Sequence, residues 1–390
     1  MSPFLLLCAA GLSAIFSSTI AKSPVLPLFA SYLGADPKAV GGIAAVSSFT
    51  GVVFSIPVGL LSDRFGRRKL LLCSALVFAT APFLYPFVTK LWQLALVRFY
   101  HGLATAAFVP VAMACVADLF HEERGEKMGW FSTATLIGRF AAPLAGGALI
   151  GFLILNPLLS YRAVYMLSGS AGFCALLFIL TVREPEKDSE PHQSWTEAWH
   201  ALRAVLSNPA IPVTSGAEAA ILFAYGTFET FFPLYAMRRG LSAYAIGLCL
   251  SAQVISLALT KPMMGRFSDR HGRAPQIFVG ALLGAASIGG FAVFSGFVAF
   301  LSLSVLFGIC MSTLTSATSA FIADLSGNAR GSAMGILGSI MDIGHTTGPL
   351  IAGAVAGYVG YAFSFVTAAA VLVGVALVFA RFVSKKPETA

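Results

Sequence analysis

The chain has 390 residues, of which 57% are hydrophobic and only 11% are charged, and its mean hydropathy is +0.83. Soluble globular domains carry about 25% charged residues, so this composition excludes a water-soluble globule and predicts a protein that crosses a membrane many times. The net charge of +8 is explained by Lys and Arg residues that concentrate on one side of the predicted membrane, so no nucleic-acid partner is expected.

Residues 1–182 contain six apolar stretches of about twenty residues or more, the length that a helix needs to cross a bilayer. No basic segment precedes the first stretch, which continues past Lys22. We therefore expect it to be retained rather than cleaved as a signal peptide. The expected spans in this half are residues 4–33, 40–61, 70–89, 91–118, 128–154 and 161–182.

Residues 183–209 form a long polar connection between the two halves. Apolar residues recur within it at helical spacing, which predicts a short helix at the cytoplasmic membrane surface, with a disordered linker as the alternative. These residues are Trp195, Ala198, Trp199, Leu202 and Leu206. The connection separates an N-terminal six-helix bundle from a C-terminal one.

Residues 210–390 contain six further apolar stretches. The whole chain is therefore predicted to be an all-α membrane protein with twelve transmembrane helices. The expected spans in this half are residues 210–236, 244–265, 275–295, 297–324, 332–358 and 361–382. The six cysteines fall within or at the edge of predicted spans and form no C-x-x-C pair, so neither a disulfide framework nor a metal site is expected, and no cofactor is expected either.

Lys and Arg residues concentrate on one side of the predicted membrane, in the connections that carry Asp63 and Arg124 and in the central linker. Because cytoplasmic loops are enriched in Lys and Arg, both termini are expected to be cytoplasmic.

The two halves repeat each other with a constant offset of 206 residues. The shift carries Gly59 onto Gly265 and Pro143 onto Pro349, and it holds without a gap over about ninety residues. The segment from Gly59 to Lys69 reads G-L-L-S-D-R-F-G-R-R-K and follows the second predicted span. Its basic residues would hold this connection in the cytoplasm, but topology alone does not explain the acid or its repetition at Asp269.

This segment resembles the signature G-x-L-x-D-R-x-G-R-[KR] of the major facilitator superfamily of transporters, and the resemblance covers essentially the whole chain. It implies two six-helix bundles related by a pseudo-twofold axis, with a shared site between them. It also implies that the two repeated segments act as cytoplasmic latches between the halves. The residues to which this role carries over are Gly59, Asp63, Arg64, Gly66, Arg67, Asp269, Arg270 and Arg273.

Two further motifs resemble those of the twelve-span drug:proton antiporters in this superfamily. Arg98 and His101 stand in a segment similar to their R-x-x-Q-G pattern, with His101 in place of Gln. The fifth span is similar to their G-x-x-x-G-P-x-x-G-G motif, with Ala142 in place of one Gly. Tight helix packing is the structural alternative for this glycine pattern. The matching residues are Gly138, Pro143, Gly146 and Gly147.

Charged residues inside predicted spans cost roughly 2.5–3.5 kcal/mol each on insertion scales, so they need compensation or a function. The carboxylates Glu218, Glu229 and Asp342, with His345, are candidates for proton coupling. Permanent ion pairing is the alternative for the carboxylates. The cations are candidates for substrate binding together with His101, although Arg98 and Lys261 could instead reach the membrane surface. These cations are Lys22, Arg98, Arg139 and Lys261.

The repeat also suggests which of these charges meet. Lys22 is equivalent to Phe228, one residue from Glu229, so Lys22 and Glu229 are a candidate pair across the two halves. Arg139 is equivalent to His345, which follows Asp342 by three residues on the same helical face. A second polar cluster shared by the two halves is therefore expected there.

The sequence therefore predicts a proton-coupled transporter, an exporter of small organic solutes or drugs, which works by alternating access in the plasma membrane as a monomer. Because Lys22 stands where related exporters of cationic drugs place an acid, uptake or uniport of an organic anion, such as a carboxylate, phosphorylated compound or siderophore, is the alternative. A membrane sensor without transport is a third possibility. No enzyme is expected, because the chain lacks a phosphate loop, an H-E-x-x-H pair and a G-x-S-x-G elbow.

Overall fold

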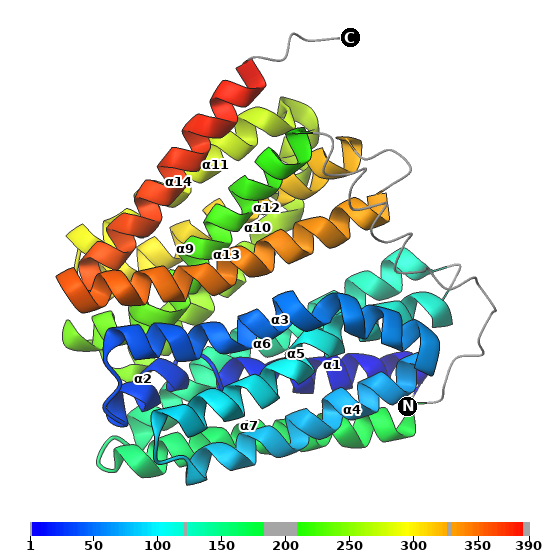
Figure 1. Cartoon of the computed structure of the whole chain (residues 1–390), viewed down its shortest axis with the longest axis vertical. Helices are drawn as coiled ribbons and strands as arrows, with labels where there is room; N and C mark the ends of the chain where they lie inside the picture. Colours follow the sequence, from blue (N-terminus) through cyan, green and yellow to red (C-terminus); the bar gives the residue numbers. More distant parts are fainter. Residues whose placement is uncertain (1, 121–122, 183–208, 326–329, 385–390) are drawn as a thin grey trace. The chain divides into compact units, whose positions relative to one another are not determined.

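The computed structural model describes residues 2–120, 123–182, 209–325 and 330–384. Within these ranges every regular element is a helix, as the sequence predicts (Figure 1). The predicted surface helix of 183–209 falls almost wholly outside the described residues. The described chain separates into two compact units. The first unit consists of the described residues of Met1–His192 together with Ser242–Ser251. The second consists of the described residues of Gln193–Leu241 together with Ala252–Ala390.

The described residues of the first unit form six helical rods, two of which are interrupted. Their elements are α1 (Pro3–Ile20), α2 (Val25–Tyr32), α3 (Pro37–Phe65), α4 (Arg67–Thr80), the 3₁₀ helix η1 (Ala81–Phe87), α5 (Leu91–Leu119), α6 (Arg124–Phe152) and α7 (Pro157–Thr181). In the second unit, the part of the chain that is described forms five complete rods and most of a sixth, α10, whose first residues belong to the first unit. Its elements are α9 (Ala210–Arg238), α10 (Ala243–His271), α11 (Arg273–Val293), α12 (Phe297–Leu325), α13 (Arg330–Val359) and α14 (Tyr361–Ser384).

Two expected spans are not continuous α-helices. The span expected at 4–33 breaks at Ala21–Pro24, where Pro24 provides no backbone N–H to continue the hydrogen bonds of α1. The span expected at 70–89 changes from α4 to the tighter η1 at Ala81, and Pro82 and Pro86 lie within η1. Both corrections concern prolines near the middle or end of an apolar stretch.

Helix neighbours are the same in the two units. In the first unit α1 packs against α6 and α7, and α4 packs against α5 and α7. In the second unit the equivalent α9 packs against α13 and α14, and α11 packs against α12 and α14. The repeat seen in the sequence is therefore also a repeat of helix packing.

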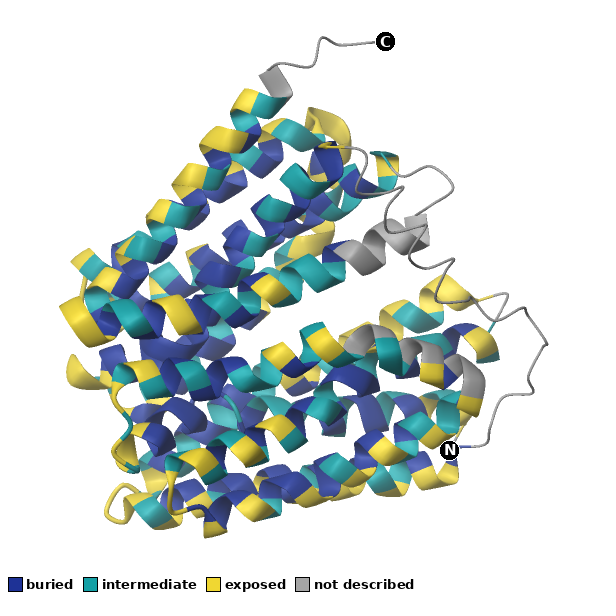
Figure 2. Ribbon diagram, in the orientation of Figure 1, coloured by how far each residue is buried: buried dark blue, intermediate teal, exposed yellow. Residues whose placement is uncertain are grey.

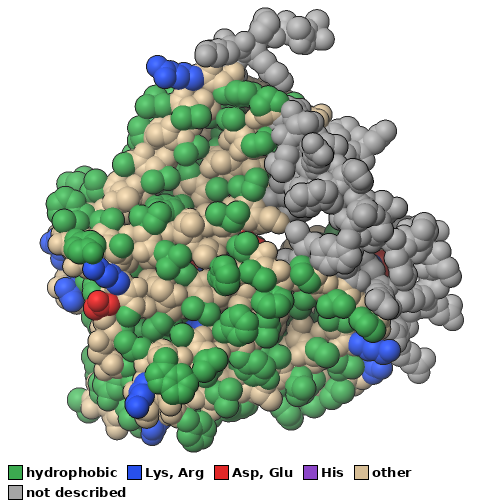
Figure 3. Space-filling model, in the orientation of Figure 1, with side chains coloured by type: hydrophobic (Ala, Val, Ile, Leu, Met, Phe, Trp, Pro, Cys, Tyr) green, Lys and Arg blue, Asp and Glu red, His purple; other side chains and the backbone are tan. Residues whose placement is uncertain are grey.

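Ten helices are long and apolar enough to cross a membrane when the described residues are considered. The helices α9 and α13 are equally long but are not among the ten. They carry Glu218, Glu229, Asp342 and His345. On the face shown in Figure 3, hydrophobic side chains cover the sides of the helices, as expected for contact with lipid.

Buried side chains form a core inside each unit (Figure 2). In the first unit, Phe78, Phe108 and Phe131 belong to a cluster from α4, α5 and α6 that is almost fully buried. In the second unit, Phe228 and Phe291 lie in contact with further buried phenylalanines of α9 and α12. These cores hold the helices that carry the polar residues described next.

Candidate functional site

Glycines bring α9 and α13 into close contact. A Cβ added to Gly344 would lie 2.9 Å from the Cα of Ala219, and one added to Gly348 would lie 3.1 Å from the Cα of Phe223. From the other side, a Cβ on Gly226 would lie 2.9 Å from the carbonyl oxygen of His345. Because a side chain at any of these positions would separate the helices, the glycines set how near the polar residues of α9 and α13 approach.

Glu229 of α9 and His345 of α13 meet where these helices cross. His345 Nε2 lies 3.3 Å from Glu229 Oε2, and the side chains are 20% and 8% exposed, respectively. The imidazole also stacks on Tyr225, with ring centroids 5.5 Å apart. Asp342 is half-buried one turn before His345 on α13. The sequence did not pair Glu229 with His345.

Glu218 lies eleven residues before Glu229, so the two carboxylates share one face of α9 about 16 Å apart. Glu218 is 1% exposed. The hydroxyl of Thr318 on α12 donates a hydrogen bond to Glu218 Oε2. Lys261 of α10 is near enough to interact with this carboxylate, although its own side chain is exposed. Thr318 is thus a partner of Glu218 that sequence reasoning missed.

Arg98 and His101 of α5 are buried within the first unit, with exposed fractions of 2% and 1%. The hydroxyl of Tyr85 lies 3.4 Å from His101 Nδ1, and the Tyr85 ring stacks on Tyr165 with centroids 4.2 Å apart. No ion pair with Arg98 is found among the described residues, and its Nε has no hydrogen-bond partner there. Burial therefore contradicts the alternative that Arg98 reaches the membrane surface.

Lys22 and Arg139 both belong to the first unit. Lys22 is half-buried at the break between α1 and α2, and Arg139 is exposed on α6. Their expected partners, Glu229 and the pair of Asp342 with His345, belong to the second unit. The pair of Lys22 with Glu229 and the polar cluster of Arg139 with Asp342 and His345 stay predictions.

The glycine motif of α6 is a packing surface within the first unit. A Cβ on Gly138 would lie 2.5 Å from the carbonyl oxygen of Leu12 on α1. A Cβ on Gly146 would lie 3.3 Å from both Ile20 and Pro24. A Cβ on Gly147 would lie 2.5 Å from the carbonyl oxygen of Ala243 at the start of α10. Tight packing, the structural alternative for this motif, is thus present at these positions.

The two latch segments are helical on both sides of a single glycine rather than loops, which corrects the expected connection after the second span. Helix α3 runs through Asp63 and Arg64 and ends at Phe65, and Gly66 with φ of 98° alone separates it from α4. Gly272, with φ of 89°, does the same between α10 and α11. A positive φ of this size favours glycine.

One arginine in each latch segment binds the end of a neighbouring helix. Arg67 donates from Nε to Asp118 Oδ2 at 2.9 Å and from Nη1 to Ser62 Oγ at 2.9 Å.

In the second unit, Arg273 donates from Nε to Asp324 Oδ2 at 2.5 Å and from Nη1 to Asp269 Oδ1 at 2.9 Å. Asp118 and Asp324 were not predicted as site residues, although the 206-residue repeat relates them. The burial of Gly59 and the side chains of Asp63 and Arg64 lie outside what the structure describes, and Arg270 is exposed.

The family model of the Major Facilitator Superfamily matches residues 6–258 and 240–390 of this chain. Among curated relatives, Multidrug resistance protein 1 of Bacillus subtilis (strain 168) is 26% identical over 364 residues, covering 92% of this chain and 90% of the relative. Multidrug resistance protein MdtG of Salmonella paratyphi C (strain RKS4594) is 28% identical over 370 residues, covering 90% and 88%.

Solved structures show the same fold. A bacterial homologue of the human lysosomal transporter Spinster superposes with a TM-score of 0.83, at 17% identity and with 100% of this chain and 98% of that one covered. The nucleoside transporter NupG superposes with a TM-score of 0.78, at 17% identity and with 99% and 100% covered. At these identities the likeness concerns the fold alone.

Proposed function

The chain belongs to the Major Facilitator Superfamily, and we propose that it is a proton-coupled exporter of small organic solutes or drugs that works by alternating access. It is a multi-pass membrane transporter rather than an enzyme. The names of the multidrug resistance relatives support export and drug-like substrates. Proton coupling is proposed from the chemistry of α9 and α13.

The observation that carries this proposal is the contact between Glu229 and His345. Both groups titrate, both are largely buried where α9 and α13 are in contact, and their interaction is an ion pair only when the imidazole is protonated. A proton bound or released at this pair changes the charge of the site by one unit, which alters its attraction for a charged substrate. Such competition between proton and substrate is the physical basis of coupled exchange.

The remaining candidate residues take supporting roles in this proposal. Asp342 and Glu218 are further proton-binding candidates. The gating role is assigned to Arg67 and Arg273 with their aspartate partners and to the segments around them. The residues assigned to charge selection and substrate contact are Lys22, Arg98, His101, Arg139 and Lys261.

We also propose where and how the protein is placed. The bacterial relatives support the plasma membrane. The distribution of Lys and Arg supports cytoplasmic termini. The protein is proposed to act as a monomer, with bundles at 1–182 and 210–390 joined by the linker at 183–209.

A second candidate function is uptake or uniport of an organic anion. Arg98 favours it, because a buried guanidinium without a carboxylate partner in the described residues is a fixed positive charge suited to an anion. In that case Lys22, Arg98 and Arg139 would be the substrate-binding charges, and Glu229 would not be required for proton movement.

Proton movement in proteoliposomes that contain an internal pH dye distinguishes the two candidates. The parent and Glu229→Gln are challenged separately with lipophilic cations and with organic anions, and Lys127→Gln, in the first turn of α6, is the control variant. A cation-triggered proton flux that is lost only in Glu229→Gln is expected. Flux triggered by anions alone, or equal flux in parent and Glu229→Gln, would contradict the proposal.

A further inference from the structure

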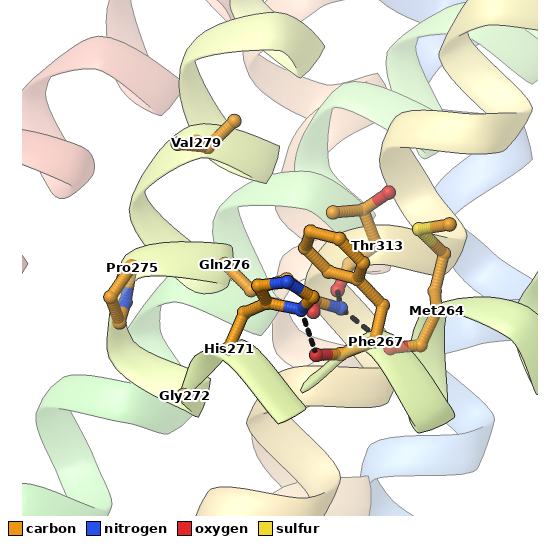
Figure 4. Close-up of a pocket in the computed structure, with 8 residues that line it drawn as sticks. All are labelled: Met264, Phe267, His271, Gly272, Pro275, Gln276, Val279 and Thr313. Atoms are coloured by element: carbon orange, nitrogen blue, oxygen red, sulfur yellow. Dashed lines mark hydrogen bonds between the residues drawn. The ribbon is translucent and has the colours of Figure 1, made fainter. Parts of the chain in front are cut away.

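A cavity of about 340 Å³ lies between α10, α11 and α12 in the second unit (Figure 4). This volume is at the lower end of the range for ligand-binding pockets. Four of the eight lining residues are apolar, one is a glycine and one is a threonine. The other two are a histidine and a glutamine. The lining residues are Met264, Phe267, His271, Gly272, Pro275, Gln276, Val279 and Thr313.

The wall on the α10 side is aromatic. The rings of Phe267 and His271 stack with centroids 4.1 Å apart, and His271 Nδ1 lies 3.2 Å from the carbonyl oxygen of Phe267 (Figure 4). Phe267 is 46% exposed and Val279, from α11, is 48% exposed. The cavity therefore opens along the side of the helices, where a membrane protein meets hydrocarbon, and its lining suits an alkyl chain.

The inner wall contains a buried amide with one unused acceptor. Gln276 is 4% exposed, and its Nε2 donates to the carbonyl oxygens of Met264 and Thr313, both at 2.9 Å. Its Oε1 has no hydrogen-bond partner in the described part of the chain. A ligand that presents a hydroxyl or ammonium hydrogen beside the apolar part of the cavity would satisfy this oxygen.

Two arginines of α10 directly precede the cavity-lining residues Phe267 and His271 in the sequence. Arg266 and Arg270, one turn apart on α10, are exposed, and neither forms an ion pair within the described ranges. Arg273, by contrast, is already bonded to Asp269 and Asp324. Helix α11 begins beside the cavity after Gly272, with no side-chain cap on its first N–H groups. A helix N-terminus without a side-chain cap, together with two arginines that have no ion-pair partner among the residues described, favours a phosphate group.

We propose that this cavity binds one anionic phospholipid from the surrounding bilayer, with an acyl chain between Phe267 and Val279 and the phosphate near Arg266, Arg270 and the start of α11. An alkyl chain matches the apolar lining, and the guanidinium groups of Arg266 and Arg270 match the lipid phosphate. The ends of membrane-spanning helices lie at the depth of the lipid headgroups. The glycerol hydroxyls of phosphatidylglycerol would also supply a donor for Gln276 Oε1. This inference does not depend on proton coupling or on the transported substrate.

Native mass spectrometry of the full-length chain in mild detergent tests this site. The protein is titrated with phosphatidylglycerol and, separately, with phosphatidylcholine of the same acyl chains. Val279→Trp fills the cavity with an indole, and Val293→Trp is the matched control because Val293 is 77% exposed near the far end of the same helix. A double variant, Arg266→Gln with Arg270→Gln, removes the two unpaired charges without altering the apolar lining.

The parent and Val293→Trp are expected to retain one phosphatidylglycerol at least fivefold more tightly than phosphatidylcholine. Val279→Trp should lose this bound lipid, and the arginine double variant should bind the two lipids equally. Thermal unfolding of each variant checks that it is folded. Equal retention of phosphatidylglycerol by Val279→Trp and Val293→Trp, or no preference between the two lipids in the parent, would overturn the proposal.

Discussion

His345 Nε2 of α13 lies 3.3 Å from Glu229 Oε2 of α9, at a helix crossing made close by Gly226, Gly344 and Gly348. The contact joins α9 and α13, which are not among the ten helices found long and apolar enough to cross a membrane in the described residues. The second unit thus places Glu229 and His345 at a close contact between two helices, and this packing sets their separation.

A double-mutant cycle measures whether Glu229 and His345 interact beyond their separate contributions. Glu229→Gln, His345→Gln and the double variant are compared by thermal unfolding in detergent. Residues in direct contact typically give coupling free energies of about 0.5–3 kcal/mol, and we expect a value in this range here. Additive effects of the two substitutions would show that the contact contributes nothing to stability and would weaken the proposed coupling pair.

Thr318→Val tests the hydrogen bond to the buried Glu218. Valine has nearly the shape of threonine but lacks the donor, so Glu218 Oε2 would lose its partner inside the membrane. We expect a loss of about 1–3 kcal/mol in stability, measured by thermal or chemical unfolding. Thr318→Ser keeps the hydroxyl and is the control. Equal stability of the valine and serine variants would contradict this prediction.

Much of the fold could be predicted from the sequence, because the lengths of the apolar stretches and the 206-residue repeat indicate where the membrane spans lie. The span expected at 91–118, for example, is helix α5 from Leu91 to Leu119. Helix breaks were harder to predict, since prolines occur both at the break near Pro24 and inside continuous helices, as at Pro110.

The polar site could be predicted only in part. The repeat placed His345 at the position equivalent to Arg139, but it gives no information on how far each helix is rotated toward its neighbour. That rotation is fixed by contacts such as Gly344 against Ala219, and it directs His345 to Glu229. Thr318 was missed for a similar reason, because α12 carries several Ser and Thr residues near it and the sequence does not show which of them faces Glu218.

Arg98→Met is expected to stabilise the fold and abolish transport. A buried guanidinium without a carboxylate partner in the described residues carries a desolvation penalty that the uncharged thioether of methionine avoids. The unfolding temperature should therefore rise by a few degrees, while proton-linked or anion-linked flux in proteoliposomes falls to background. A variant that unfolds at a lower temperature would show that Arg98 supports the structure rather than the function.

The glycines of α6 allow a comparison within one helix. A Cβ at Gly138 would lie 2.5 Å from the carbonyl oxygen of Leu12, whereas a Cβ at Gly129 would meet no atom within 4 Å. Gly138→Ala must therefore move α6 away from α1, and we expect it to destabilise the protein by about 1–3 kcal/mol. Gly129→Ala should stabilise it by about 0.4–1 kcal/mol, because alanine has less backbone freedom in the unfolded chain.

Both variants are measured by thermal unfolding in the same detergent, and their transport is then measured in proteoliposomes. If the glycine motif acts through packing, transport should fall in Gly138→Ala and stay at the parent level in Gly129→Ala. Opposite changes in unfolding temperature are the diagnostic result, since a general intolerance of α6 to substitution would lower both. Equal stability of the two variants would mean that α1 and α6 can separate without loss, and that the close approach at Leu12 does not hold the first unit together.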